Sequence, residues 1–398
     1  MKVLTVNCVD TGSTGSIINS IEKNLYGKCE FEICYERGQV VRNSNRYRIT
    51  PKIEFLFYYA FGRLTGIKYG TGYTSTIRLL MKIKRTHPDV VHVHCPNTNS
   101  INLYMLFSYL KKKEIPTVIT NHAEFYYTGN CPHSFECLKF QSGCGECDYV
   151  FDPYRPYLFD RTRYEWKKMY DSFQNYKKLI MIAVSPWQEH RMRLSPIVKD
   201  LNIRTIMNGV DTDVFHYMPG LFEDKTGKKI LHVTAGFSNG LDDLKGGRYI
   251  IQLAKIMPEY EFTVVGPCVN INERALPTNI KLTGAIKSKK ELARLYSGAD
   301  ITVIVSKRET FGMVCAESLC CGTPVIGFSA GGPESIAMLD NSVFVDYGDI
   351  EQLKKEIKES KKMQSADKEK LSQFAQKKYS CRKMASSYYE IYKEVIAL

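Results

Sequence analysis

Short apolar runs alternate along the chain with longer segments in which apolar residues recur at helical spacing. Runs of this length, bounded by turn residues, predict buried strands of parallel sheets, and the segments between them predict helices. The alternation is typical of α/β domains. The predicted strands lie at Lys2–Val9, Phe31–Glu36, Val90–His94, Thr117–Thr120, Met181–Pro186, Lys229–Gly236, Glu261–Pro267, Ile280–Ile286, Ile301–Ser306, Thr323–Phe328 and Ser342–Tyr347. The stretch Ile203–Asp211 predicts a strand followed by an Asn-Gly turn.

The alternation is interrupted at Phe215–Lys229, where Pro219-Gly220 and mixed charges predict a linker. At 398 residues the chain is also too long for one compact domain. We therefore predict an N-terminal Rossmann-like domain over residues 1–206 and a second one over residues 207–380, with their parallel sheets facing across a central cleft. The apolar stripe of a last helix, residues 381–398, predicts that this helix packs back on the N-terminal domain.

The stretch Glu309–Glu334 reads ETFGMVCAESLCCGTPVIGFSAGGPE; it follows the predicted strand Ile301–Ser306 and contains the predicted strand Thr323–Phe328. Glu309 and Glu317 are eight residues apart, so Glu317 fits on a helix while Glu309 lies in the loop before it. A helix N-terminus at the carboxyl end of a strand is where α/β sheets bind phosphate groups. Carboxylates accept hydrogen bonds from sugar or ribose hydroxyls. The pattern therefore predicts a nucleotide-sugar site.

Three other places add candidate ligand contacts. Lys245 precedes Gly246-Gly247 at a predicted helix start, where its charge and the free backbone amides suit a diphosphate. The loop Asp10–Ser16 joins the first strand to a helix, and its glycines let a ligand approach the backbone. His122 follows a strand at the sheet edge where open sheets place ligands. His92 and His94, by contrast, are interpreted as packed polar residues rather than metal ligands.

Four cysteines lie within 17 residues: Cys131, Cys137, Cys144 and Cys147. Thiolates are preferred zinc ligands, and the group ends in Cys-x-x-Cys, so a tetrahedral structural zinc site is one hypothesis. The spacing is not that of a standard zinc ribbon or finger. Free thiols in a lid loop and a redox pair are the alternatives.

The net charge of +13 is uneven, because residues 1–205 carry 29 Lys and Arg against 18 Asp and Glu. A basic first half suggests an anionic partner, which would be a membrane surface, a lipid phosphate or a nucleic acid, or else only a charged solvent-facing surface. Two readings are open for the aromatic segment Ile53–Phe61, which is followed by the basic Arg78–Arg85. It is either a core helix or a surface that touches lipid or a lipid-linked acceptor.

The chain opens on a predicted strand rather than a signal peptide, and it has no run of about 18 apolar residues. We expect a cytoplasmic protein with reduced thiols, attached peripherally to the inner face of the cell membrane. The aromatic residues are not interleaved with basic ones in a nucleic-acid-binding module, so no nucleic-acid partner is expected.

At Glu309–Glu334 the sequence closely resembles the retaining glycosyltransferases of family 4, which have the GT-B fold of two Rossmann-like domains. The resemblance covers essentially the whole chain. Its elements are GSTGS, HPDVVHVH, TVITNHAEFYYTGNC, the four-cysteine stretch, NGVDTDVF, LKGG and the glutamate block. The TGNC segment with the cysteines is similar to a bacterial branch that builds capsular, colanic-acid-like or other exopolysaccharide.

The resemblance implies roles for individual residues. Glu317 would hold the donor ribose, Glu309 the ring hydroxyls of the transferred sugar, and Lys245 the diphosphate leaving group. His122 would contact the sugar from the opposing domain. The remaining implied donor contacts are Gly12 and Gly15 near the diphosphate, Gly266 and Ile286 at the nucleobase, and the backbone of Phe311, Gly312 and Met313 at the sugar and diphosphate.

The sequence departs from the family in two places. Relatives usually have Asp after the histidine, where this chain has Ala123 followed by Glu124. Many relatives also have an Arg after the first strand of the second domain, where this chain reads Gly236-Phe237-Ser238. Lys307 or Arg308 would be the substitutes. The departures concern acceptor activation and part of the diphosphate clamp, and leave the donor carboxylates unaffected.

The implied activity is transfer of a hexose from a nucleotide-diphosphate sugar, UDP rather than GDP, to a saccharide or lipid-linked acceptor. Retention would follow from a front-face reaction in which the departing diphosphate takes the acceptor proton. No metal is expected, because the one Asp-x-Asp, Asp211-Thr212-Asp213, is interpreted as a turn. The alternatives are a sugar-nucleotide epimerase or phosphorylase on the same fold and a non-catalytic nucleotide-sugar-binding subunit.

Overall fold

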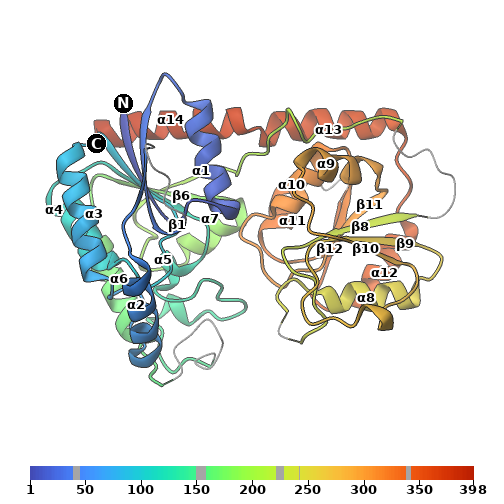
Figure 1. Cartoon of the computed structure of the whole chain (residues 1–398), viewed down its shortest axis with the longest axis horizontal. Helices are drawn as coiled ribbons and strands as arrows, with labels where there is room; N and C mark the ends of the chain where they lie inside the picture. Colours follow the sequence, from blue (N-terminus) through green and yellow to red (C-terminus); the bar gives the residue numbers. More distant parts are fainter. Residues whose placement is uncertain (39–44, 149–157, 221–227, 242, 338–341) are drawn as a thin grey trace. The chain divides into compact units, whose positions relative to one another are not determined.

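The computed structural model describes residues 1–38, 45–148, 158–220, 228–241, 243–337 and 342–398. The chain forms two compact units (Figure 1). The first consists of Met1–Met207 together with Met384–Leu398, and the second of Asn208–Lys383. The sequence places the domain boundary between residues 206 and 207; part of the predicted linker, residues 221–227, lies outside the described residues.

The first unit is built on a seven-stranded sheet with the order β3-β2-β1-β4-β5-β6-β7, in which every pairing is parallel. The strand order reverses between β1 and β4, because the chain adds β2 and β3 on one side of β1 and the later strands on the other side. The loops after β1 and β4 therefore leave the carboxyl ends of these strands in opposite directions. The strands are β1 (Lys2–Val9), β2 (Glu30–Arg37), β3 (Arg46–Arg48), β4 (Val90–Val93), β5 (Thr117–Asn121), β6 (Leu179–Ala183) and β7 (Asn202–Thr205).

Alternate residues of these strands enter two separate cores, as the two-residue period of a strand requires. Leu4 of β1 packs in one core and its neighbour Val3 in the other. The helices of the unit are α1 (Gly12–Asn24), α2 (Lys52–Thr65), α3 (Tyr73–Thr86), α4 (Leu103–Lys112), α5 (Phe125–Thr128), α6 (Thr162–Phe173), α7 (Pro186–Arg193) and α14 (Cys381–Ala397), with the 3₁₀ turn η1 (Lys139–Gln141).

The helix α14 completes one of these cores. Its side chains Tyr388, Tyr392 and Val395 are fully buried against residues of β1, β4, β5 and β6. These residues repeat at spacings of three and four, so they share one face of the helix. From Met384 onward the C-terminal segment is therefore part of the first unit.

The second unit is built on a six-stranded parallel sheet with the order β10-β9-β8-β11-β12-β13. Here the order reverses between β8 and β11. The strands are β8 (Lys229–Val233), β9 (Glu261–Val265), β10 (Ile280–Gly284), β11 (Ile301–Ile304), β12 (Val325–Phe328) and β13 (Val343–Val345). The helices are α8 (Gly247–Ile256), α9 (Lys289–Gly298), α10 (Met313–Cys320), α11 (Gly332–Ile336), α12 (Ile350–Glu359) and α13 (Ser365–Tyr379), with the 3₁₀ turn η2 (Glu273–Ala275).

Most predicted strands and helices are confirmed, with differences of a few residues at their ends. The strand β3 was not predicted, because its sequence Arg-Tyr-Arg carries no apolar run. The core-helix reading of Ile53–Phe61 is wrong: Ile53 is 83% and Phe57 61% exposed on α2. Asp211 lies in a turn as predicted, since its carbonyl accepts hydrogen bonds from the backbone of Val214 and Phe215.

Candidate active site

The strongest charge pair of the predicted site lies at the carboxyl edge of the second unit's sheet. Lys245 follows β8 and Glu309 follows β11, the two strands between which the sheet order reverses. The Lys245 Nζ atom lies 2.5 Å from Glu309 Oε1, and the two side chains are 38% and 24% exposed. The structure thus brings together two predicted residues 64 positions apart, at the place where open α/β sheets bind ligands.

A second carboxylate, Asp243, fixes the loop that carries Lys245. Its Oδ1 accepts a hydrogen bond from the Lys245 backbone N–H and its Oδ2 one from Gly247, both at 2.9 Å. Between them Gly246 has a φ of +72°, and a Cβ atom there would lie 2.2 Å from the carbonyl oxygen of Val305. Only glycine fits this position, so Gly246 is required by the close approach of the loop to the residue that follows β11.

The backbone of Glu309 is held by two hydrogen bonds, in addition to the ion pair of its side chain. Its N–H donates to Ala330 O at 3.0 Å, and its carbonyl accepts from Gly332 N–H at 2.8 Å. The segment that receives these bonds is itself held by Glu334, whose carboxylate accepts the N–H groups of Ala330 and Gly331 at 3.0 and 2.6 Å. The Glu309 carboxylate therefore projects from a fixed backbone while it remains partly exposed.

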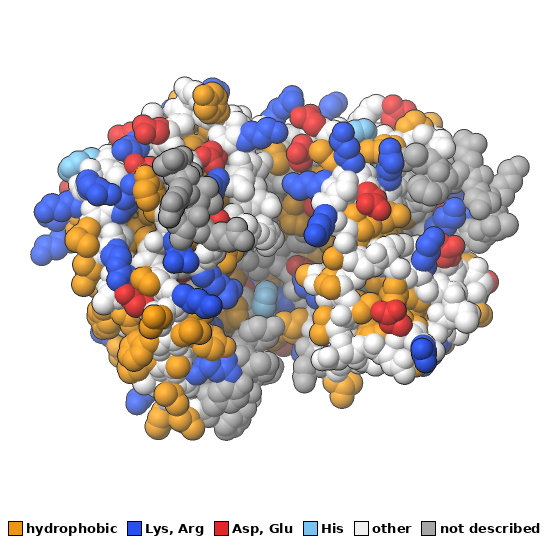
Figure 2. Space-filling view, viewed as in Figure 1, with side chains coloured by type: hydrophobic (Ala, Val, Ile, Leu, Met, Phe, Trp, Pro, Cys, Tyr) orange, Lys and Arg blue, Asp and Glu red, His pale blue; other side chains and the backbone are white. Residues whose placement is uncertain are grey.

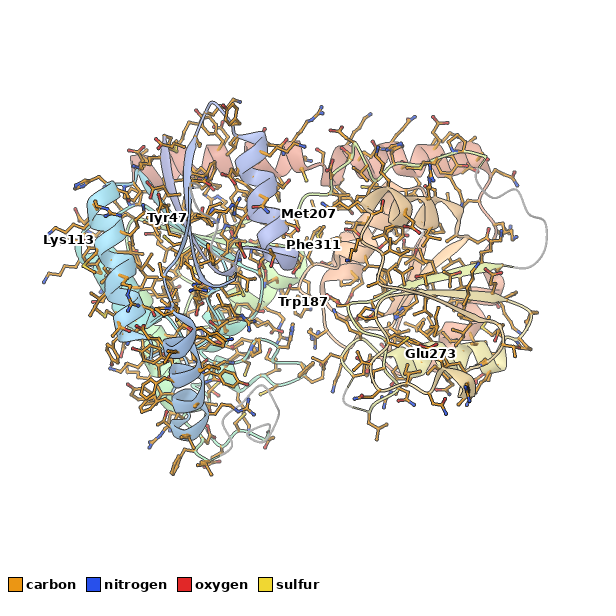
Figure 3. All side chains as sticks on the ribbon, viewed as in Figure 1. Tyr47, Lys113, Trp187, Met207, Glu273 and Phe311 are labelled. Carbon is orange, nitrogen blue, oxygen red and sulfur yellow. The ribbon has the colours of Figure 1, made fainter. Side chains whose placement is uncertain are left out.

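The helix α10 begins directly after this loop. Gly312 is its N-cap and Met313 its first residue. Phe311, labelled in Figure 3, is buried, and its ring is nearly perpendicular to that of Tyr379. Glu317 lies on α10 as predicted, and its Oε2 accepts a hydrogen bond of 3.1 Å from the Tyr296 hydroxyl. Although part of the side chain is exposed, burial of the carboxyl group raises the pKa of Glu317 to about 7.

The two residues predicted at the nucleobase follow neighbouring strands of the same sheet. Gly266 follows β9, and its N–H donates to the carbonyl of Gly284, the last residue of β10, at 2.9 Å. Ile286 lies two residues beyond Gly284 and is half-buried. Both are thus at the carboxyl edge that also carries Lys245 and Glu309.

In the first unit, Gly12 and Gly15 belong to the first turn of α1. A Cβ atom at Gly15 would lie 2.7 Å from the carbonyl carbon and oxygen of Asp10, so the helix can approach the end of β1 only with glycine there. At Gly12 the same atom would meet nothing within 4 Å. The loop of the sequence motif is therefore a close turn from strand to helix.

His122 directly follows β5 and is bonded to a second histidine. Its Nε2 lies 2.9 Å from Nδ1 of His94, and the two rings are nearly parallel, at 11°. Burial lowers the pKa of His122 to about 4 and the pKa of His94 well below its usual range. The prediction that His92 and His94 are packed polar residues is confirmed, since each is 1% exposed and hydrogen-bonded.

The departure at Ala123 and Glu124 has a structural explanation. Glu124 is fully buried, and its Oε2 accepts hydrogen bonds from Ser134 Oγ at 2.5 Å and from Arg191 Nε at 3.3 Å. Arg191 also donates to Ser134 Oγ at 2.6 Å. The carboxylate therefore ties α5 and the segment after it to α7, and its charge is directed away from solvent.

The predicted cysteine site is not formed as a metal centre in the described part of the chain, where no three His, Cys, Asp or Glu side chains are grouped to hold an ion. Cys131 is buried, and Cys144 Sγ lies 3.6 Å from the carbonyl oxygen of Thr128. Zinc binding by Cys131, Cys137, Cys144 and Cys147 thus stays a prediction without geometric support.

The proposed substitutes for the missing Arg lie near the pair. The Lys307 backbone N–H donates to Leu244 O at 2.8 Å, and Arg308 Nη1 lies 3.5 Å from Ala330 O. Sequence reasoning missed Asp243, Tyr296 and Glu334, which hold the predicted residues. An Asp shortly before Gly-Gly at a helix start is a capping signal that could have identified Asp243; Tyr296 carries no such signal.

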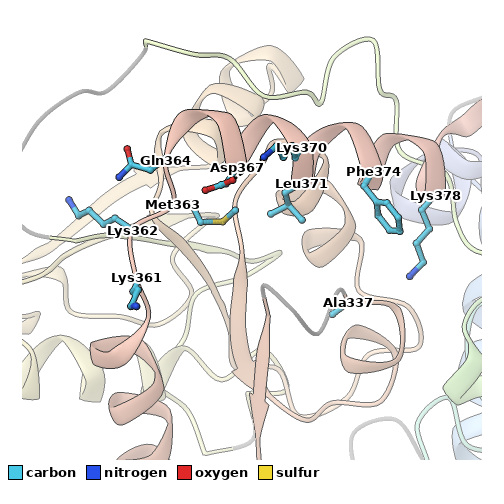
Figure 4. Close-up of a pocket in the computed structure, with 10 residues that line it drawn as sticks. All are labelled: Ala337, Lys361, Lys362, Met363, Gln364, Asp367, Lys370, Leu371, Phe374 and Lys378. Carbon is cyan, nitrogen blue, oxygen red and sulfur yellow. Dashed lines mark ion pairs between the residues drawn. The ribbon is translucent and has the colours of Figure 1, made fainter.

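A pocket of about 790 Å³ in the second unit lies apart from these residues (Figure 4). It is lined mainly by Lys361–Gln364 and by α13, including Phe374, and it contains none of the predicted site residues. Five of its lining residues are charged, four of them lysines, and neither Lys245 nor Glu309 is among the lining residues.

Comparison with known proteins identifies the class. The family model described as Glycosyltransferase Family 4 matches residues 36–214, and the one described as Glycosyl transferases group 1 matches residues 224–379. Together they account for most of both units. The chain therefore belongs to the family 4 glycosyltransferases.

Individual relatives agree with this assignment. An uncharacterized 41.2 kDa protein of the cps region of Klebsiella pneumoniae is 22% identical over 327 residues, 79% of this chain and 81% of that protein. A D-inositol 3-phosphate glycosyltransferase of Xylanimonas cellulosilytica is 28% identical over 173 residues, which are 37% of this chain and 40% of that enzyme.

Solved structures show the same GT-B fold class. Sucrose-phosphate synthase from Thermosynechococcus elongatus has a TM-score of 0.70 at 15% identity, with 100% of this chain and 99% of that chain covered. Anabaena HepE in complex with UDP has a TM-score of 0.68 at 14% identity, with 99% of this chain and 100% of that chain covered.

Among the described residues, no helix is long and apolar enough to cross a membrane.

Proposed function

We propose that this glycosyltransferase transfers a hexose from a UDP-sugar to a saccharide or lipid-linked acceptor, with retention of configuration, in the synthesis of a surface polysaccharide. The observation that carries the proposal is the Lys245–Glu309 pair at the reversal point of the second unit's sheet. The relative from a cps region supports a role in polysaccharide synthesis. The UDP complex of a structural neighbour supports uracil as the base of the donor nucleotide.

The chemistry follows from what each side chain offers. Lys245 supplies a positive charge for the diphosphate, which gains negative charge as the bond to the sugar breaks. Glu309 accepts hydrogen bonds from ring hydroxyls, and Glu317 accepts them from the ribose. Because a diphosphate would compete with Glu309 for the Lys245 ammonium, donor binding opens the ion pair and frees the carboxylate for the sugar. The acceptor proton goes to the departing diphosphate, without a metal ion.

A panel of UDP-, GDP- and ADP-sugars tests the donor directly. The melting temperature of the protein should rise most with a UDP-sugar, and calorimetry should then show weaker binding in Glu317→Ala by at least about 1 kcal/mol, because ribose hydroxyls lose their acceptor. Glu291→Ala, which removes an exposed carboxylate of α9, is the control. Equal affinity of UDP for the wild type and Glu317→Ala would overturn the role of Glu317.

Two further readouts separate the alternatives. Slow hydrolysis of the donor by the purified chain, lost in Glu309→Ala, would rule out a non-catalytic binding subunit. Conversion of the nucleotide sugar without any acceptor would indicate an epimerase, and a requirement for free phosphate would indicate a phosphorylase.

We also propose that the first unit attaches to an anionic membrane through the α2 surface. This surface consists of the exposed apolar side chains of α2 and its neighbour α3, which are 42–83% exposed: Ile53, Leu56, Phe57, Phe61, Leu64, Tyr73, Ile77 and Met81. Figure 2 shows hydrophobic side chains over α2 with Lys and Arg side chains among them. Exposed Lys52, Lys84 and Arg85 supply the charge that anionic lipid attracts.

Sedimentation with vesicles tests this attachment. The protein should bind phosphatidylglycerol vesicles better than phosphatidylcholine vesicles, and salt should weaken the binding. Phe57→Glu should release it, whereas Leu241→Glu, at a leucine of the second unit that is 81% exposed, should not. Binding that is independent of lipid charge and of Phe57 would reject the proposal.

A further inference from the structure

A row of three histidines lies at the carboxyl end of β4 and β5. His92 and His94 are both on β4 or directly after it, and their rings are 3.9 Å apart. His94 Nδ1 is 2.9 Å from Nε2 of His122, and these two rings are 5.2 Å apart. His92 and His94 are buried, whereas His122 is partly exposed. The two buried rings, His92 and His94, therefore lie on the interior side of the partly exposed His122 ring.

The row is anchored from the far side by hydroxyl groups. His92 Nδ1 is 2.8 Å from the Tyr392 hydroxyl, and its Nε2 is 2.8 Å from Thr120 Oγ1. Thr120 Oγ1 is in turn 2.9 Å from the Tyr388 hydroxyl. Both ring nitrogens of His92 are thus occupied, which fixes the plane of its ring, and His94 packs against that plane.

The hydrogen bond between His94 and His122 contains a single proton when both rings are neutral. Burial favours the neutral rings, since it lowers the pKa of both histidines. Whichever ring donates, Nε2 of His122 is committed to His94. Any contact of the His122 ring with a sugar hydroxyl must then be made through Nδ1, in one ring orientation.

We propose that His94 is a positioning residue, which through its hydrogen bond to Nε2 fixes the ring orientation of His122 and couples the tautomer of His122 to that of His94. This inference rests on the proposed function, because it gives His122 a defined face toward the sugar. His94 itself does not touch the substrate. It acts only through the ring beside it.

The first test needs no substrate. Selective ¹⁵N labelling of the eight histidines, with His122 assigned by its loss in His122→Gln, reports the tautomer of each ring. In the wild type His122 should remain neutral, in one tautomer, down to about pH 5. A His122 that titrates like a free histidine, or that shows mixed tautomers in the wild type, would overturn the proposal.

Three variants separate positioning from packing. His94→Phe keeps a ring but loses the hydrogen bond, so His122 should show mixed tautomers. His94→Asn offers an amide near the position of Nδ1 and should restore a single tautomer. Tyr392→Phe removes a hydroxyl from His92 without touching the His94–His122 bond, and it should leave the His122 signals unchanged. Unchanged His122 signals in His94→Phe would contradict the proposal.

Turnover of the best donor from the panel then measures the consequence. In His94→Phe, kcat should fall by about tenfold or more, because a misplaced contact costs rate, whereas the affinity for UDP should not change. His94→Asn should recover most of the loss. If the tautomer changes but kcat does not, the positioning stands and the role of His122 in the proposed function fails.

Discussion

The two units place different chemistry at the same edge of similar sheets. In the second unit the edge carries an accessible ion pair, Lys245–Glu309, whose side chains are 38% and 24% exposed. In the first unit it carries the His94–His122 pair, which burial keeps neutral. The first unit also has an ion pair, Glu124–Arg191, but both partners are buried.

This contrast shows that the exposure of an ion pair decides whether its charged groups can bind a ligand. An exposed pair can exchange its partner for a charged ligand, because water and salt already weaken it. A buried pair cannot, because separating its members leaves an uncompensated charge in the interior. The second unit is therefore suited to a diphosphate, and the first to hydroxyl groups that accept and donate hydrogen bonds.

The largest effect is expected from Lys245→Met. It removes the charge at the second unit's edge, so kcat/KM should fall by about 100- to 1000-fold, the usual loss when a group that stabilises developing charge is removed. Lys255→Met, at an exposed lysine of α8, should retain full activity. A loss below about fivefold would show that the accessible pair is not part of the reaction.

Arg191→Met should act on stability instead. It leaves the Glu124 carboxylate buried without its cation, and the free energy of unfolding should fall by about 3 kcal/mol in denaturant titrations. Arg193→Met breaks an exposed pair with Glu189 on the same helix and should cost less than about 0.5 kcal/mol. Similar losses of unfolding free energy in the two variants would contradict the proposed difference between buried and exposed ion pairs.

Glu317→Gln should change how stability depends on pH. Because burial raises the Glu317 pKa to about 7, the folded chain keeps a proton between about pH 4.5 and 7 that the unfolded chain has lost. The wild type therefore loses stability as pH rises through this window, whereas glutamine cannot ionise. Thermal unfolding should show the variant gaining on the order of 1 kcal/mol over the wild type from pH 5 to pH 8. A constant difference across this range would contradict the raised pKa.

Tyr296→Phe should give the smallest change. The Tyr296 hydrogen bond holds the Glu317 pKa lower than burial alone would, so its loss should raise that pKa further. Binding of UDP, followed by calorimetry at several pH values, should weaken by about 0.5–1 kcal/mol, most visibly near neutral pH. Tyr260→Phe, at a tyrosine of the second unit distant in sequence from the glutamate, should show no change.

The sequence predicts local features well and pairings poorly. Strands such as β1 and helices such as α10 follow from apolar runs and spacing, and the placement of Glu317 on a helix follows from them. The contact of Lys245 with Glu309 depends on which strands become neighbours, and spacing along the chain does not encode that. The exposure of α2 could not be predicted either, because the sequence of an aromatic helix does not show whether the helix lies in a core or on the surface.

The place of α14 in the first unit has a consequence for biosynthesis. Residues of its apolar face complete a core whose other members lie in strands made nearly two hundred residues earlier or more. The ribosome therefore synthesises the whole second unit before the first unit can complete this core. Until then, the apolar residues of β1, β4, β5 and β6 that α14 covers stay exposed, and loss of the last turns of α14 would leave this core of the first unit incomplete.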